Sequence, residues 1–430
     1  MTRPTDTTST RTTAGDRPHI FQLDVLRGFA AGLVFFAHIW LYAVVEPPAG
    51  AERERSAAEH RAAYQPAAGA SWWRGFGADD PRLYPFVWYS MGWVAVPVFF
   101  VISGFCIHYG SLRPGAKPGD PPLLKFSFRT YILRRFWRIY PAYLFALLLF
   151  AVVLFATSAD PGGTLWIHKG NLAAHLLLIH NWRPQWIYEY SPAFWSLGLE
   201  FQFYLMYPLL LWLRSRMGIE RATLAFLALG LASRAVLAPF IPLSNDAIWR
   251  GPTVTFFDWC LGALIAERFV QGRRLVNFSY WWAAPVVAAG VFLAGTRYSI
   301  TAETTVWSLV AVFLVDGYVN AKRTAGWLER RLMAFGVVSY SFYLLHAPMT
   351  QWTYRFLYEW GISGGLVWDL TLGAAAAFIP ILAASWLTYR LVEAPGIALG
   401  RRLMSRRSAP PLAAIAGAVL AEADEGPRRA

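Results

Sequence analysis

Long apolar stretches alternate with shorter polar connections along almost the whole chain. Ten stretches are long enough to cross a bilayer as helices, and they cover residues 26–45, 91–110, 139–157, 198–213, 222–241, 252–270, 281–296, 303–319, 337–354 and 366–391. A further apolar run, Leu172 to Ile179, is too short to span and is expected to form a re-entrant or interfacial helix. The pattern predicts an all-α fold, a polytopic bundle of about ten transmembrane helices within residues 20–400, with tails at 1–19 and 401–430.

Composition and the placement of charge indicate a membrane protein. The chain has 430 residues, of which 56% are hydrophobic and only 15% charged, and this excludes an ordinary soluble globule. Its net charge of +13 comes from cations that flank the apolar stretches, with seven Lys and Arg residues between the second and the third. The connections after the even-numbered stretches carry most of these cations. The positive-inside rule therefore predicts that both termini are cytoplasmic, and no nucleic-acid partner is expected.

The N-terminus, the cysteines and the first connection add three expectations. Residues 1–20 are polar and lack a small-residue cleavage site, so the first span is expected to stay as an anchor. Cys106 and Cys260 fall inside predicted spans, which argues against a disulfide framework and against a thiolate metal site. Trp72 and Trp73, in the long first connection, could stack on a sugar or anchor the connection among lipid headgroups, and both interpretations stay open.

The first apolar stretch contains one histidine, His38, eleven residues after Arg27. On a helix eleven residues return to within about 20° of the same face and rise about 16.5 Å. Arg27 is therefore expected at one membrane surface, where Asp24 can pair with it, and His38 near the bilayer centre. Ionisable groups at that depth are costly and usually functional, and a neutral imidazole there can accept a proton from a hydroxyl.

A run of cations precedes the third apolar stretch. Arg134, Arg135 and Arg138 lie at its predicted cytoplasmic end, and Tyr143 follows them. Guanidinium groups suit phosphate, but the same residues could only set topology by facing anionic lipid. The sequence pattern alone does not separate these two interpretations.

Two more polar positions lie at or inside apolar stretches. Glu200 stands near the predicted outer end of the fourth stretch, where it could orient an acceptor hydroxyl or stabilise the helix N-terminus. His346, in the ninth stretch, is the second histidine predicted deep in the membrane. It could take part in chemistry or make an interhelical hydrogen bond.

Six short motifs that contain these residues occur in order between residues 20 and 400. They are Leu23-Asp24-Val25-Leu26-Arg27-Gly28 followed by His38, Phe99-Phe100-Val101-Ile102-Ser103-Gly104-Phe105, Arg138-Ile139-Tyr140-Pro141-Ala142-Tyr143, Trp195-Ser196-Leu197 with Glu200, Ser339-Tyr340-Ser341 with His346, and Glu393-Ala394-Pro395. Each motif is weak alone. Together they resemble the acyltransferase-3 family of integral membrane proteins.

The resemblance implies a ten-helix enzyme that moves an acyl group, acetyl first, from acyl-CoA to a hydroxyl. The acceptor is commonly a cell-envelope or exported carbohydrate or a glycolipid, and in some members a macrolide-type natural product. The resemblance also implies a multi-pass protein of the bacterial cytoplasmic (inner) membrane, surrounded by lipid, with no permanently bound cofactor and no metal. It carries essential roles onto Arg27 and His38, and further roles onto Arg135, Arg138, Tyr143, Trp195, Ser196, Glu200 and His346.

The expected mechanism combines the residue pattern with this resemblance. Arg135, Arg138 and Tyr143 would bind acyl-CoA at the cytoplasmic side, and the thioester would reach His38. The acceptor hydroxyl would enter from the outer side past Glu200 and lose its proton to His38 as it attacks. Arg27 and Glu200 complete the expected catalytic set, and the residues expected to line the site or the acceptor path are Asp24, Ser103, Trp195, Ser196 and His346. A relay through acyl-histidine is the second option.

A transporter or flippase of a lipid-linked sugar is the competing class of protein. In that case Arg27 and His38 would line a pathway, because intramembrane charges are common to transporters and membrane enzymes. The absence of an internal sequence repeat and the presence of all six motifs favour the enzyme.

Overall fold

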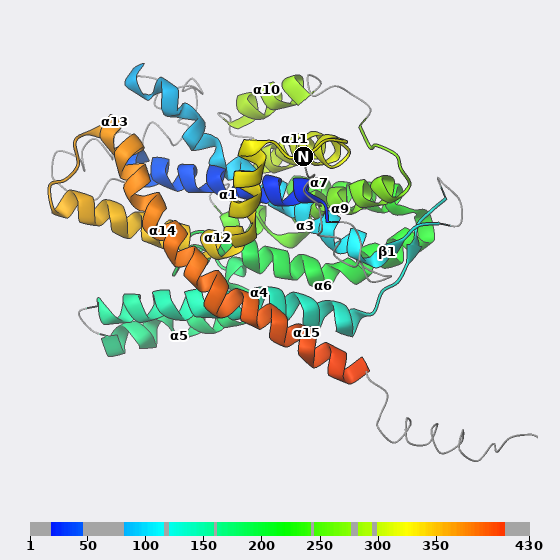
Figure 1. Ribbon diagram of the computed structural model, residues 1–430, viewed down its shortest axis with the longest axis horizontal. Helices are drawn as coiled ribbons and strands as arrows, with labels where there is room; N and C mark the ends of the chain where they lie inside the picture. Colours follow the sequence, from blue (N-terminus) through cyan, green and yellow to red (C-terminus); the bar gives the residue numbers. More distant parts are fainter. Residues whose placement is uncertain are drawn as a thin grey trace, which may run out of the picture.

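The computed structural model describes residues 19–45, 81–115, 120–158, 161–241, 245–276, 283–294 and 299–408, and these residues are mostly helical (Figure 1). In chain order the helices are α1 (Phe21–Trp40), α3 (Ala95–Ser111), α4 (Phe128–Ala156), α5 (Pro161–Leu176), α6 (Phe194–Met217), α7 (Ile219–Leu237), α8 (Asp246–Trp249), α9 (Pro252–Val270), α10 (Ala283–Ala294), α11 (Ser299–Val319), α12 (Trp327–Glu359), α13 (Leu366–Trp368), α14 (Ala374–Thr388) and α15 (Ala394–Ser408). Strands β1 (Leu112–Arg113) and β2 (Leu123–Leu124) form a short antiparallel pair.

Tighter and wider helical turns extend several of these helices. A 3₁₀ segment, Pro81–Val94, leads into α3, and a short one, His180–Trp182, lies between α5 and α6. Turns of π-helix continue α1 at Leu41–Val45 and join α13, α14 and α15 at Asp369–Gly373 and Tyr389–Glu393. Residues 366–408 therefore form one long helical element, which Figure 1 shows running diagonally across the bundle in orange and red.

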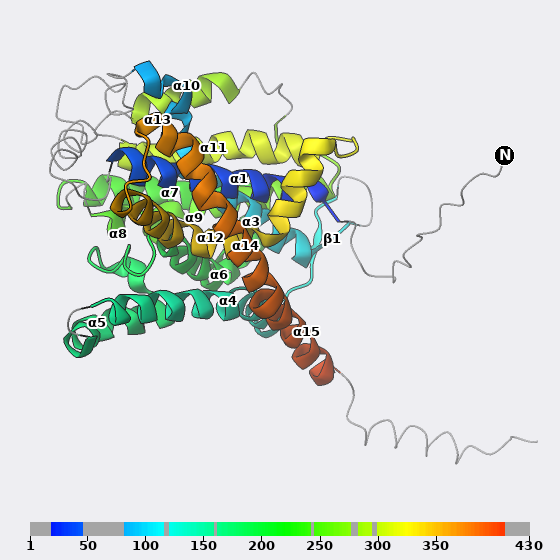
Figure 2. The same ribbon diagram turned by 60° about the vertical axis from the view of Figure 1, so that its left-hand side comes forward.

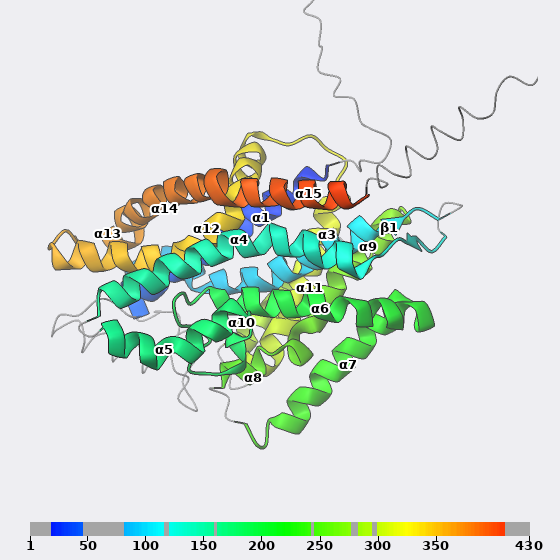
Figure 3. The same cartoon turned by 90° about the horizontal axis from the view of Figure 1, so that it is seen from below.

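The helices pack as a bundle around α1. On one side α1 contacts α12, which contacts α14; on the other side it contacts α3, which packs on α9 and through it on α7. Figure 2 shows α4 and α5 along one edge of this bundle, and Figure 3 shows α15 lying along α4. The site described below lies where α1, α3, α4, α6 and α12 meet.

Glycines allow the central helices to approach each other at backbone distance. A Cβ atom added to Gly28 would stand 2.2 Å from the carbonyl oxygen of Leu332, and one on Gly336 would stand 2.0 Å from that of Asp24. The contact of α3 with α9 is similar, because a Cβ on Gly262 would lie 1.9 Å from the oxygen of Val101. Small residues at such crossings are typical of membrane helices, which gain stability from close van der Waals packing.

Each apolar stretch predicted from the sequence overlaps helix among the described residues. The boundary differs most at the last stretch, which is predicted to end at residue 391 whereas the helical element continues to Ser408, and it also differs at α4. The third stretch is predicted to begin at residue 139, whereas α4 begins at Phe128. Arginine and leucine are good helix formers, so the helix continues through the cationic run that hydropathy assigns to a connection. Arg129, Arg134, Arg135 and Arg138 thus all lie on α4.

Five helical segments among the described residues are long and apolar enough to cross a membrane. They are Phe21–Val44, Pro81–Ser111, Phe128–Ala156, Trp327–Glu359 and Leu366–Met404, and Thr305–Val319 is a shorter apolar helix. The count of ten spans and the cytoplasmic position of both termini stay predictions. The expectations for Trp72, Trp73 and the two ends of the chain, residues 1–18 and 409–430, lie outside the described residues.

A polar network fixes the end of α3. His108 Nδ1 is hydrogen-bonded to the Tyr207 hydroxyl of α6 at 2.9 Å. Its Nε2 lies 2.9 Å from the Glu267 carboxylate of α9. Arg214 of α6 also binds Glu267, and its Nη2 donates to the Pro122 carbonyl at 2.8 Å. Because charged pairs buried between helices are geometrically exacting, this network holds α3, α6 and α9 in one register.

The last turn of α5 and the connection to α6 lie outside the predicted spans and hold a buried histidine pair, His175 on α5 and His180 in the connection. The rings of His175 and His180 are parallel, with centroids 3.8 Å apart. Burial lowers the pKa of His175 to about 4 and also lowers that of His180. The apolar run 172–179, expected to form a re-entrant or interfacial helix, lies partly in α5, which ends at Leu176. The chain then turns, and His180 packs beside Gly198 of α6.

The first prediction concerns the crossing of α1 and α12. Gly28→Val should lower the stability of the purified protein by at least ~1–3 kcal/mol, because the new side chain must push α12 away. Gly32→Val is the matched control on the same helix, since a Cβ there meets nothing within 4 Å. Thermal unfolding in detergent measures both variants. Equal melting temperatures for Gly28→Val and the wild type would contradict the described crossing.

The second prediction follows from the histidine pair. Folding keeps His175 neutral, so its contribution to stability is complete above pH 6.5 and falls as the pH drops from 6.5 toward 4, where only the unfolded chain takes up the proton. His175→Gln keeps a donor for the Asn171 carbonyl but does not titrate. The loss in melting temperature between pH 7.5 and pH 5.0 should therefore be smaller in this variant, by the equivalent of up to about 2 kcal/mol. An unchanged loss would show that His175 is protonated in the folded protein.

Candidate active site

A small cavity of about 130 Å³ lies at the junction of five helices. Its polar lining comes from α1, α3, α4, α6 and α12 and consists of Arg27, Ser103, Cys106, Arg135, Arg138, Ser196, Glu200, Tyr204, Ser339, Tyr340 and Tyr343. Its apolar lining consists of Val96, Phe99, Phe100, Ile102, Ile139 and Leu197. The cavity thus combines three guanidinium groups with one carboxylate and an apolar wall.

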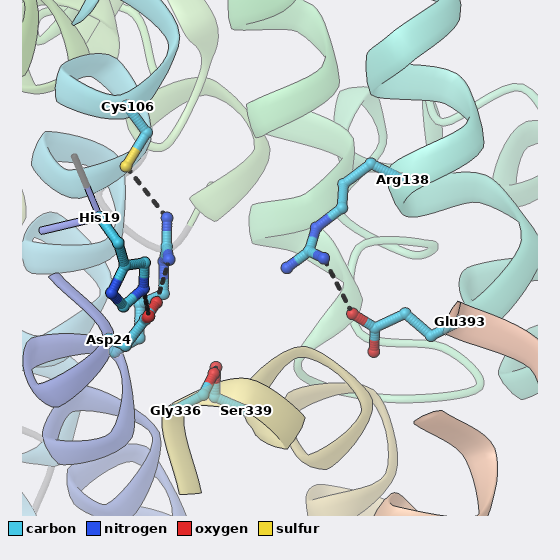
Figure 4. Close-up of polar contacts among 8 residues, drawn as sticks. His19, Asp24, Cys106, Arg138, Gly336, Ser339 and Glu393 are labelled. Carbon is cyan, nitrogen blue, oxygen red and sulfur yellow. Dashed lines mark hydrogen bonds and ion pairs between the residues drawn. The ribbon is translucent and has the colours of Figure 1, made fainter. Parts of the chain in front are cut away.

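Arg27 reaches the cavity from the first turns of α1. Its Nη1 donates to Asp24 Oδ1 at 2.6 Å, and its Nη2 donates to Cys106 Sγ on α3 at 3.0 Å. The Asp24 carboxylate also lies 2.7 Å from His19 Nε2 (Figure 4). These contacts fix the guanidinium plane at the wall. The thiol of Cys106 is a lining group that was not expected from the sequence.

Arg138 lies opposite, on α4, and is paired with Glu393 (Figure 4). Its Nη1 is 3.4 Å from Glu393 Oε1, and Ser341 Oγ donates to the other carboxylate oxygen at 2.7 Å. Glu393 is only 1% exposed. Glu393 belongs to one of the six motifs, but no role was assigned to it from the sequence. Its position, as a single carboxylate just after the last predicted span, was the signal that could have identified it as a site residue.

Glu200 lines the same cavity as the arginines, and entry of the acceptor past it from the outer side stays a prediction. The helix α6 begins at Phe194, so Glu200 lies about 9 Å along it and not at its end. Tyr204, one turn later, donates its hydroxyl to Glu200 Oε1 at 2.6 Å. Ser196, one turn earlier, bonds with the Tyr343 hydroxyl at 2.6 Å.

His38 and His346 face each other across α1 and α12. His346 Nε2 lies 3.2 Å from His38 Nδ1, and the two rings are nearly perpendicular at 85°. His346 Nδ1 is 2.8 Å from the Tyr343 carbonyl, and His38 Nδ1 is 3.0 Å from the Val34 carbonyl.

These contacts define which nitrogen carries the proton on each ring. A carbonyl oxygen only accepts, so both Nδ1 atoms must donate, and Nε2 of neutral His346 is then an acceptor for His38 Nδ1. The Nε2 atom of His38 consequently keeps its lone pair. Within the described part of the chain no group hydrogen-bonds to this atom.

The histidine pair and the cavity are adjacent but distinct. Neither His38 nor His346 lines the cavity, whereas Tyr343 does. The ring centroid of Tyr343 lies 5.4 Å from that of His346 and 5.5 Å from that of Phe99, another lining residue. Tyr343 is therefore the side chain that connects the two groups.

Two residues expected in the site lie elsewhere. The Tyr143 hydroxyl donates to the His175 carbonyl at 2.9 Å, and this ring is buried away from the cavity lining. The Trp195 ring lies against the guanidinium of Arg250, whose Cζ is 4.7 Å from the ring centroid, and not at the cavity. Trp195 directly precedes the lining residue Ser196, and the 100° step along a helix turns it to another face. Tyr143 lies one turn beyond the lining residue Ile139, and its hydroxyl is held by the His175 carbonyl of α5.

The Ser103 hydroxyl lines the cavity and accepts a hydrogen bond from Trp259 Nε1 at 3.3 Å. Groups of three or more His, Cys, Asp or Glu side chains placed to hold a metal ion do not occur among the described residues.

Comparisons with known proteins give the family. A family model described as "Acyltransferase domain" (Acyl_transf_3) matches residues 20–390. The chain is 29% identical to Acyltransferase MdmB of Streptomyces mycarofaciens over 353 residues, which cover 74% of this chain and 83% of that protein. It is 24% identical to Peptidoglycan O-acetyltransferase OatA of Listeria monocytogenes over 341 residues, covering 72% of this chain and 52% of the relative.

A third relative, O-acetyltransferase OatA of Staphylococcus aureus, is 25% identical over 293 residues, covering 61% of this chain and 46% of that protein. The chain thus matches about half the length of the OatA proteins. No solved structure matches it. The family match extends over most of the chain and includes every helix that lines the cavity. The chain belongs to the acyltransferase-3 family, as its six motifs indicated.

Proposed function

We propose that this protein transfers a short acyl group from an acyl-CoA thioester to a hydroxyl of a cell-envelope or exported carbohydrate. One observation carries the proposal: a cavity with three arginines adjoins a histidine whose Nε2 lone pair is available. The arginines suit an anionic donor, and the histidine suits removal of a hydroxyl proton.

The size of the cavity favours a short acyl group. Pockets for drug-sized ligands usually measure about 300–1,000 Å³, so a cavity of about 130 Å³ suits a small group. This space accommodates an acetyl thioester and the adjoining part of a pantetheine arm. Val96, Phe99 and Phe100 would enclose the acyl end and keep water from hydrolysing it.

His38 acts as the general base in the proposed step. Its Nε2 takes the proton of the acceptor hydroxyl, the hydroxyl oxygen forms the new ester bond, and the carbon–sulfur bond breaks to release the coenzyme A thiolate, which then takes up a proton. His346 Nε2 accepts a hydrogen bond from His38 Nδ1–H and holds the His38 ring in this tautomer. Imidazolium formation at His38 is then stabilised by the His346 lone pair and the Val34 carbonyl.

The thioester must reach His38 past Tyr343. The hydroxyl of Tyr343 is held by Ser196, and its ring rests on Phe99. Rotation of this one aromatic side chain would join the cavity to the histidine pair, so the proposed step includes its displacement. The same lone pair could attack the thioester and form an acyl-histidine. Incubation with labelled acetyl-CoA without acceptor, followed by protein mass spectrometry, separates this relay from direct transfer.

The carbohydrate acceptor is proposed from the relatives, since two of those described are named O-acetyltransferases and one acts on peptidoglycan by name. Mass spectrometry of ester-linked acyl groups on surface glycans, glycolipids and macrolide-type natural products tests this, in cells with and without the protein. An ester on a carbohydrate only in cells with the protein is expected. An ester on the natural product alone would move the acceptor to that second class.

His38→Ala should lower acyl transfer by roughly 10²–10⁴-fold, the usual contribution of a positioned general base. The matched control is His168→Ala on α5, a histidine remote from the cavity lining. Turnover of acetyl-CoA by the detergent-solubilised protein measures both, and it also excludes a transporter, which needs a sealed membrane. A near wild-type rate for His38→Ala would contradict the proposed step.

Arg138→Ala should raise the KM for acyl-CoA by roughly 10–100-fold and change kcat much less, because a charge-assisted hydrogen bond to bound phosphate is worth about 1.5–3 kcal/mol. Glu393→Gln should raise KM in the same direction but less, since it loosens the guanidinium without removing it. Initial rates over a range of donor concentrations give both constants, with Arg330→Ala as a control on α12. An unchanged KM for acyl-CoA in Arg138→Ala would mean that this arginine does not bind the donor and only sets the membrane topology.

A further inference from the structure

A second cavity, of about 630 Å³, is lined by residues of α4 and α15. Figure 3 shows these two helices lying alongside each other. We call this cavity the arginine vestibule. Five arginines line it, Arg129, Arg134, Arg135 and Arg138 from α4 and Arg401 from α15, together with Trp137 and four other residues. Arg135 and Arg138 line the small cavity as well, so the two cavities lie on either side of the same two guanidinium groups.

The lining of the vestibule has an unbalanced charge. None of its lining residues, all within the described part of the chain, is acidic. Glu393 pairs with Arg138 from outside the lining, and this leaves four guanidinium groups facing the vestibule. Arg129, Arg134 and Arg401 are exposed, and cations gathered around one cavity favour an anionic ligand there. Guanidinium groups bind phosphate with paired hydrogen bonds, so a ligand with several phosphate groups fits this chemistry.

Packing places Arg401 in this lining. A Cβ on Gly400 would stand 2.4 Å from Trp137 Cβ, and one on Gly396 would stand 3.0 Å from Pro141 Cγ, so α15 lies directly against α4. The next residue, Arg401, then faces the vestibule, and Arg402 does not line it. The C-terminal helix thereby contributes a cation that lies more than two hundred residues from the α4 arginines in the sequence.

The sizes and linings of the two cavities indicate the ligand. The larger cavity is lined by arginines, the smaller one has an apolar wall, and Arg135 and Arg138 line both. We propose that the arginine vestibule binds the phosphate-bearing nucleotide head of the donor through Arg129, Arg134 and Arg401, and so determines that the donor is a nucleotide thioester. This inference rests on the proposed function. Anionic lipid headgroups share the phosphate chemistry, so the test distinguishes the two sources.

The test compares three donors that differ only in their head: acetyl-CoA, acetyl-dephospho-CoA and S-acetylpantetheine. In Arg401→Ala the KM for acetyl-CoA should rise about tenfold, the KM for acetyl-dephospho-CoA less, and that for S-acetylpantetheine less than twofold. Arg129→Ala should behave in the same way, and Arg401→Lys should recover part of the loss. Arg402→Ala is the matched control on the same helix and should match the wild type. Equal effects on all three donors, or none, would overturn the proposal.

Two further measurements distinguish donor binding from lipid binding and from failure of the proposed function. In nanodiscs of neutral phosphatidylcholine the effect of Arg401→Ala should persist; an effect seen only with phosphatidylglycerol, and the same for every donor, would assign the vestibule to lipid. Binding of radiolabelled adenosine 3′,5′-bisphosphate needs no turnover. If the wild type binds the bisphosphate and Arg401→Ala binds it more weakly, the result supports nucleotide binding in the vestibule. This holds even if the wild type consumes no acyl-CoA, and then only the proposed function fails. Absence of bisphosphate binding to the wild type would overturn the vestibule.

Discussion

The close crossing of α1 with α12 is the constraint on which the rest of the structure depends. At Gly28 and Gly336 each helix presents bare backbone to the other, and no side chain larger than hydrogen fits between them. This contact sets the rotation of both helices. It places His38 opposite His346 and turns Arg27 toward α3 and the cavity. A wider spacing would separate the imidazoles and leave the Nδ1 proton of His38 with the Val34 carbonyl alone.

Two chemical environments meet at this crossing. The arginines make the cavity positively charged. The histidine pair lies behind Tyr343 and Phe99, among aromatic and apolar side chains. With the proposed donor bound, such an arrangement would keep its anionic head hydrated while its reactive end enters a place with little water. Glu393 lies on the last helical element, residues 366–408. Through its ion pair it holds the guanidinium of Arg138 on α4 in place.

Much of this was accessible from the sequence, since it depends on periodicity and on residue type. The apolar stretches predicted the helices, and the six motifs predicted the family. The relative rotation of helices was not accessible, because it follows from packing of particular side chains. Tyr143 and Trp195 therefore lie away from the cavity, whereas Glu200 lines it together with the arginines. Arg401 was expected in a tail, because a cationic helix end has no hydropathy signal.

The central claim is that the arginine-lined cavity and the histidine pair are two parts of one transfer site. Electron cryo-microscopy of the protein with a non-hydrolysable thioether analogue of acetyl-CoA tests it most directly. We expect the analogue's carbonyl carbon within reach of His38 Nε2, with the Tyr343 ring displaced and the phosphates among the arginines of the vestibule. An analogue bound elsewhere, or one whose acyl end stays on the far side of an unmoved Tyr343 ring, would contradict this claim.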